Sequence, residues 1–198
     1  MVVAAPTAPI EGEPADAPRG PTPLTVGVVV WLASELMFFS GLFAAWFTLR
    51  ASTNPWPPDG VELATVHTAV ATVILLASSF TMHLAHGAAV RGERRRAVRW
   101  LAVTAAMGLV FLSNVAYEWN EASFRISTNA YGSMFFLMTG FHGLHVIGGL
   151  AFMGFVAWTV SGRGSRAPLH SSVEVCAYYW HFVDVVWVAL FLTIYVLQ

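Results

Sequence analysis

The sequence predicts an all-α protein, an integral membrane bundle of five transmembrane helices. Of its 198 residues, 57% are hydrophobic and only 11% are charged, whereas soluble domains carry about 25% charged residues. Five apolar stretches also reach the length of about 20 residues that a helix needs to cross the bilayer core. A closed β-barrel is excluded, because these stretches are too long and do not alternate between polar and apolar residues.

The chain divides into a tail and a membrane domain. Residues 1–24 are rich in Pro, Ala and acidic residues and lack the basic start and apolar centre of a signal peptide. They are predicted to form a disordered cytoplasmic tail. Residues 25–198 are predicted to form the five-helix domain, with helices at approximately 25–49, 63–90, 98–117, 130–160 and 171–197.

Short polar links separate these helices. Pro, Asn and Gly in residues 51–60 predict a turn. Residues 91–96 (RGERRR) predict a charged hairpin, the longest link spans 118–129, and residues 161–170 are rich in Gly and Ser. Because no soluble domain is predicted, a functional centre is expected inside the bundle or in these links.

The arginines predict the orientation of the bundle. All ten basic residues of the chain are Arg, and cytoplasmic links of membrane proteins are enriched in basic residues. An odd number of helices places the two termini on opposite sides. Arg50 and Arg125 fall on one side, and the other side collects Arg19, Arg91, Arg94, Arg95, Arg96, Arg99, Arg163 and Arg166. The N-terminus is therefore predicted to be cytoplasmic and the C-terminus extracytoplasmic.

Charge and cysteine content exclude several classes of function. The net charge of −1, without a basic domain, gives no sign of a nucleic-acid partner. Cys176 is the one cysteine of the chain. An internal disulfide and a C-x-x-C redox or metal motif are therefore excluded.

Five ionisable residues fall inside the predicted helices at overlapping depths. Glu35 lies ten residues into the first helix, about 15 Å from its cytoplasmic end. His142 and His145 lie on the fourth helix and His181 and Asp184 on the fifth, each pair three residues apart and so on one face. We predict that Glu35, uncharged at pH 7, forms a polar cluster with one or more of the other four. Spacing alone leaves open whether the cluster is a proton relay, an ion site or an interhelical hydrogen-bond network.

The histidines also raise the hypothesis of a metal site. His142, His145 and His181 with Glu35 or Asp184 have the chemistry to bind a metal ion, and two histidines can hold a haem. Two histidines at i and i+3 are less diagnostic than an H-E-x-x-H pattern. The hydrogen-bond network is therefore the stronger interpretation.

Basic residues near the cytoplasmic ends of the helices are predicted to contact lipid headgroups. They are His83, His86, Arg91, Arg94, Arg95, Arg96, Arg163, Arg166 and His170. Trp180 and Trp187 are expected to pack inside the bundle. The glycines of GFHGLHVIGG (140–149) are expected to let a neighbouring helix approach closely.

Four blocks of sequence carry a resemblance to a known family. They are WLASELMFFSGLFAAWF (31–47), HLAHGAAVRGERRRAVRWL (83–101), AYGSMFFLMTGFHGLHVIGG (130–149) and YYWHFVDVVWVALFLTIYV (178–196). With these blocks the chain resembles subunit III of haem–copper terminal oxidases, most closely the cytochrome c oxidase form. Many members have seven helices, and this chain resembles a shorter five-helix form that lacks the first two. In the longer form those two helices make a cleft that holds phospholipid. Lipid sites in that cleft cannot form within this chain.

The resemblance implies a non-catalytic role in a proton-pumping oxidase. It implies no catalytic residue, metal or cofactor in this chain. Haem a, haem a3 and copper are then expected in partner subunits, which argues against a metal site at His142, His145 and His181. The implied partners are subunit I above all, subunit II, small subunits and phospholipids, and a larger respiratory supercomplex is a further hypothesis. Glu35 matches the family's membrane-buried glutamate, and Glu174 matches a glutamate upstream of its WHFVD motif.

The resulting prediction is subunit III of an aa3-type cytochrome c oxidase in a bacterial plasma membrane. The chain would stabilise subunit I and support proton uptake in aerobic electron transport. One alternative is subunit III of a quinol oxidase, which a neighbouring subunit II without copper would indicate. A second is a standalone proton-coupled transporter using Glu35 and Asp184, which the lack of internal repeats and broken helices disfavours.

Overall fold

The computed structural model describes residues 23–161 and 168–197, and within these ranges it contains helices and no strand. The elements are α1 (Pro23–Ser52), α2 (Thr65–Val90), α3 (Arg94–Glu121), α4 (Ala130–Ser161), α5 (Leu169–Phe191) and a terminal π-helical turn, η1 (Leu192–Val196). Each of α1 to α4, and α5 together with η1, is long and apolar enough to cross a membrane. The prediction of an all-α, five-helix membrane protein is confirmed.

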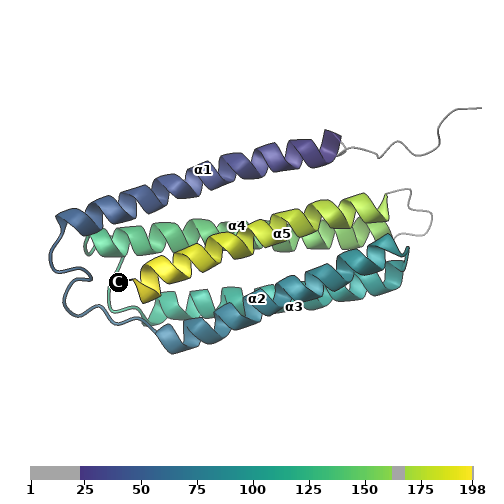
Figure 1. The fold of residues 1–198 in the computed structure, drawn as a ribbon. Helices are drawn as coiled ribbons and strands as arrows, with labels where there is room; N and C mark the ends of the chain where they lie inside the picture. Colours follow the sequence, from purple (N-terminus) through teal and green to yellow (C-terminus); the bar gives the residue numbers. More distant parts are fainter. Residues whose placement is uncertain (1–22, 162–167, 198) are drawn as a thin grey trace, which may run out of the picture.

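The helices alternate in direction and form a bundle of four with a fifth helix outside it. Helices α2, α3, α4 and α5 pack in a ring in which each contacts the next, and α5 closes the ring against α2. Helix α1 contacts α4 and α5 and lies apart from α2 and α3 (Figure 1). The starts of α1 and α5 and the turn between α2 and α3 lie at one end of the molecule (Figure 1).

The buried face of α3 shows why the bundle forms. Its buried positions Leu101, Thr104, Gly108, Phe111 and Val115 recur at intervals of three and four residues. This spacing places them on one stripe of the helix. The stripe faces the interior of the bundle, where Gly108 lies against Trp180 and Phe111 against Trp187, both of α5.

Two indole rings fix α5 inside the ring of helices. Trp180 lies against Gly108 of α3 and Gly149 of α4, where an added Cβ would come within 2.7 and 2.8 Å of its ring atoms. The Trp180 indole N–H donates to Ser78 Oγ of α2 at 2.9 Å. The indole N–H of Trp187, two turns further along α5, donates to Thr72 Oγ1 of α2 at 2.9 Å. The glycines therefore let helices approach closely, as expected for residues 140–149, and both tryptophans are fully buried.

Helix α3 is longer at both ends than the predicted range 98–117. Arg94, Arg95 and Arg96, expected in a hairpin, lie in its first turn. An arginine can join a helix near the interface, because its aliphatic stem follows the helix while its guanidinium reaches polar groups. Arg94 shows this, since its Nη1 donates to the Val160 carbonyl oxygen at the end of α4 at 2.7 Å. Glu118, expected in a link, lies in the last turn of α3.

The described residues include two of the predicted tail, Pro23 and Leu24. Residues 1–22 lie outside the described residues, as do Arg163 and Arg166. Pro23 and Leu24, placed in the tail by the prediction, begin α1.

Candidate functional site

Glu35 and His145 join α1 to α4 within the membrane-spanning part of the bundle. Glu35 Oε2 lies 3.1 Å from His145 Nε2. His145 Nδ1 lies 2.7 Å from the Phe141 carbonyl oxygen one turn earlier. The Tyr179 hydroxyl of α5 donates to the His145 carbonyl oxygen at 2.9 Å. Three helices therefore meet at this pair.

The contacts of His145 determine how protons are arranged there. A carbonyl oxygen can only accept a hydrogen bond, so Nδ1 must carry a hydrogen. The contact between Nε2 and Glu35 then needs one proton, held either by the carboxyl or by the imidazole. Both arrangements leave the pair with no net charge, which suits a site in hydrocarbon. The pair can hold and exchange one proton without leaving an isolated charge.

A second polar group lies at the interface of α2 and α5. The Ser79 hydroxyl of α2 donates to Asp184 Oδ2, and its oxygen lies 2.9 Å from His181 Nδ1. Asp184 is 3% exposed. Its other oxygen, Oδ1, is buried with no hydrogen-bond partner among the described residues.

The Ser79 hydroxyl can bridge a proton between the two ionisable groups. When Ser79 donates to an ionised Asp184, its oxygen accepts from an Nδ1–H of His181. When Asp184 carries the proton, it can donate to Ser79, which then donates to a bare Nδ1. With a hydrogen kept on His181 Nε2, the first state pairs an imidazolium with a carboxylate and the second is neutral at both groups, and a shift of both protons along the Asp184–Ser79–His181 chain converts one into the other.

His142 is separate from both groups. Its side chain is fully buried, and neither ring nitrogen has a hydrogen-bond partner in the described parts of the chain. The ring lies 4.9 Å from that of Trp187 and 5.8 Å, edge on, from that of Phe111. The five predicted residues therefore occupy three places, and the interactions of the described residues join Glu35 only to His145.

Most of the residues predicted to contact lipid headgroups lie at one end of the bundle, at the end of α2 and the starts of α3 and α5. The rings of His86 and His170 lie 5.4 Å apart, and His170 Nδ1 lies 3.8 Å from Glu174 Oε2. Glu93, between α2 and α3, accepts from Arg91 at 2.9 Å and from Arg96 at 3.2 Å. These hydrogen bonds, with that from Arg91 the stronger, lower the pKa of the Glu93 carboxyl, so it stays ionised at neutral pH.

Sequence reasoning missed Glu118, a buried carboxyl at the opposite end of the bundle. It is 4% exposed, and its Oε2 accepts from the Tyr195 hydroxyl of η1 at 2.7 Å. With Glu62 and Glu121 it lines a pocket of about 250 Å³. The signal was present in the sequence, because Glu118 continues the stripe of Phe111 and Val115 at the same three- and four-residue spacing.

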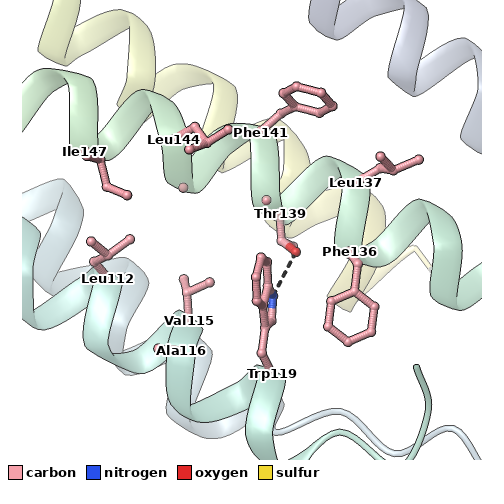
Figure 2. Close-up of a pocket in the computed structure, with 12 residues that line it drawn as sticks. Leu112, Val115, Ala116, Trp119, Phe136, Leu137, Thr139, Phe141, Leu144 and Ile147 are labelled. Atoms are coloured by element: carbon pink, nitrogen blue, oxygen red, sulfur yellow. Dashed lines mark hydrogen bonds between the residues drawn. The ribbon is translucent and has the colours of Figure 1, made fainter. Parts of the chain in front are cut away.

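An apolar groove runs between α3 and α4. It measures about 430 Å³ and is lined by residues such as Leu112, Trp119, Phe136 and Leu144. Figure 2 shows Trp119 pointing toward Thr139, to whose Oγ1 its indole N–H donates at 3.1 Å. Because the Trp119 N–H already has this hydrogen-bond partner, the groove presents an apolar surface that an apolar neighbour can pack against and no reactive group.

The described residues include no group of three or more His, Cys, Asp or Glu side chains placed to hold a metal ion. Cys176 is a buried free thiol.

Comparison with known proteins identifies similar chains over almost the whole length. Residues 15–198 match the family model described as cytochrome c oxidase subunit III. A probable cytochrome c oxidase subunit 3 of Mycobacterium tuberculosis is 45% identical over 183 residues, which cover 90% of each chain. One from Mycobacterium leprae is 46% identical over the same share. The cytochrome c oxidase subunit 3 of Thermostichus vulcanus is 40% identical, covering 87% of this chain and 86% of its own.

Proposed function

We infer the function of the chain from one premise, that it belongs to the cytochrome c oxidase subunit III family. It is a multi-pass membrane protein with the role of subunit III, which implies a complex with other oxidase subunits. We propose that the complex is an aa3-type cytochrome c oxidase and that haem a, haem a3 and copper lie in its subunits I and II. The names of the relatives favour cytochrome c over quinol as the electron donor.

Within this complex we propose that the chain stabilises subunit I and supports proton uptake. The observation that carries the proposal is the family match over residues 15–198. Two hydrogen-bonded groups inside the membrane domain support it, since the geometry of Glu35–His145 and of Asp184–Ser79–His181 allows each to hold an exchangeable proton. Proton transfer at either group requires no redox centre in this chain.

The proposed location is a bacterial plasma membrane, with the N-terminus in the cytoplasm. The distribution of arginines supports this orientation. Arg91 and Arg96 lie at the end of the bundle where α1 starts, whereas Arg50 and Arg125 lie at the other end. Protons for O₂ reduction would then be taken up on the side where the His86–His170 and Arg91–Glu93 contacts lie.

A strain that lacks this chain tests the proposal. We expect the remaining complex to keep its haem absorption but to take up protons more slowly and to lose activity sooner during turnover. Proton uptake and O₂ consumption are measured on the purified oxidase with and without the chain. Equal rates of proton uptake and equal lifetimes would contradict the proposed role.

A further inference from the structure

A cationic groove lies along the first turns of α3, away from both proton-holding groups. Arg96, Arg99, Trp100 and Val103 line it, and its volume is about 470 Å³. These residues stand at i, i+3, i+4 and i+7, so they share one face of the helix. Arg96, Arg99 and Val103 are exposed, and Trp100 is half-buried.

The two arginines differ in what they already bind. Arg96 uses one Nη1 hydrogen for Glu93 Oε2, which leaves most of the five N–H donors of its guanidinium. Arg99 forms no hydrogen bond or ion pair with the residues that the structure describes. Glu93, in the α2–α3 turn, does not line the groove, and its charge is shared between Arg96 and Arg91. The groove therefore keeps a net positive charge.

The basic, aromatic and apolar side chains of the groove follow one another along α3 in the same order as the phosphate, glycerol and acyl parts of a phospholipid. Arg96 and Val103 are seven residues apart, which is about 10 Å along the helix. The headgroup region of a bilayer is about 5–8 Å thick on each side, so Val103 reaches hydrocarbon when Arg96 stands among the headgroups. Trp100, between them, is a residue type enriched at that interface. Guanidinium groups bind phosphate through paired N–H donors.

We propose that this groove is a specific site for an anionic phospholipid, whose phosphate is held by Arg96 and Arg99 and whose glycerol and first acyl carbons lie against Trp100 and Val103. The site does not depend on the proposed proton-uptake role, because it requires only that α3 crosses the membrane. A bound lipid would anchor the start of α3 at the end of the bundle that carries the starts of α1 and α5 (Figure 1).

Photo-crosslinking of the intact oxidase complex in vesicles tests the site. The probe is a phosphatidylglycerol with a diazirine near the start of one acyl chain, and labelled peptides are located by mass spectrometry. We expect labelling of the peptide that contains Trp100 and Val103. A charge-assisted hydrogen bond to a phosphate changes affinity by about tenfold or more, so Arg99→Gln should lower labelling by about that factor and the Arg96→Gln/Arg99→Gln double variant further.

Arg95 provides the matched control. It is exposed in the same turn of α3 but does not line the groove, so Arg95→Gln should leave labelling unchanged. Arg99→Gln removes no contact found among the described residues and should assemble normally.

Four results would overturn the proposal. Equal loss from Arg95→Gln and Arg99→Gln would indicate a general surface charge effect. Equal labelling by the same probe with a phosphatidylcholine headgroup would show that the site does not select an anionic lipid. Loss of labelling in excess inorganic phosphate would assign the arginines to free phosphate. An unlabelled Trp100–Val103 peptide in the intact complex would exclude a lipid from the groove.

Discussion

The hydrogen bond between Glu35 and His145 gives the sharpest prediction, because two substitutions separate its possible roles. His145 Nδ1 donates to Phe141, so Nε2 of a neutral ring is an acceptor. In Glu35→Gln the amide N–H can donate to this nitrogen and keep α1 attached to α4, but it cannot carry an exchangeable proton. In Glu35→Leu both the hydrogen bond and the proton are lost.

The expected loss of attachment follows from the contacts of α1. Among the described helices, α1 packs mainly against α4 and α5. Its contacts include the stack of Trp31 on Tyr179 of α5 at 5.4 Å and the edge-on contact of Phe38 with Phe141 of α4 at 4.9 Å. An interhelical hydrogen bond in a membrane contributes on average about 0.6 and at most about 1.7 kcal/mol. At 1.4 kcal/mol for each tenfold change, Glu35→Leu should weaken docking of α1 by about 3- to 16-fold. Glu35→Gln should weaken it by less than about twofold.

Hydrogen exchange of the α1 amides in the purified complex measures this docking, and proton uptake is measured on the same preparations. We expect faster exchange in Glu35→Leu only, and slower proton uptake in both variants with haem content and most O₂ reduction retained. Exchange in Glu35→Gln as fast as in Glu35→Leu would refute the hydrogen-bond argument. Normal proton uptake in Glu35→Gln would reduce Glu35 to a structural role. Loss of haem from either variant would contradict the proposal that the haems lie in other subunits and do not depend on Glu35.

Two further predictions concern packing and the missed carboxyl. Gly149→Ala would place a Cβ 2.8 Å from the Trp180 ring and should lower the unfolding free energy by about 1–3 kcal/mol. Gly154→Ala on the same helix, with nothing within 4 Å, should be neutral in a thermal unfolding assay, and equal effects would contradict the packing argument. Tyr195→Phe removes the donor to Glu118 and should destabilise the chain by about 1–3 kcal/mol. Adding Glu118→Met should restore much of that stability, and a double variant less stable than Tyr195→Phe would argue against the buried-acceptor explanation.

The helices could be predicted from the sequence because hydropathy depends on local composition. The ends of α3 could not, since they depend on contacts with distant residues. Arg94 extends the helix by reaching the Val160 carbonyl 66 residues away. Glu118 stays in the helix as a buried carboxyl because Tyr195, 77 residues away, donates to it.

The helices that carry the intramembrane polar residues could be predicted, whereas which of these residues contact one another could not. Spacing placed His142 and His145 on one face of α4, yet packing divides that face between α1 and the α3–α5 side. Ser79 could not be identified from the sequence, because an uncharged serine is common in transmembrane helices and does not by itself indicate a polar site. Its position bridging His181 and Asp184 becomes visible only when α2 and α5 are packed together.

Affinity purification of the tagged chain from native membranes, followed by a visible absorption spectrum, tests the central claim most directly. An oxidase subunit III should bring down haem-containing partners in equal amount, with haem a bands and O₂ reduction supported by cytochrome c. A chain that purifies as a monomer or homo-oligomer without a haem-containing partner would contradict the account.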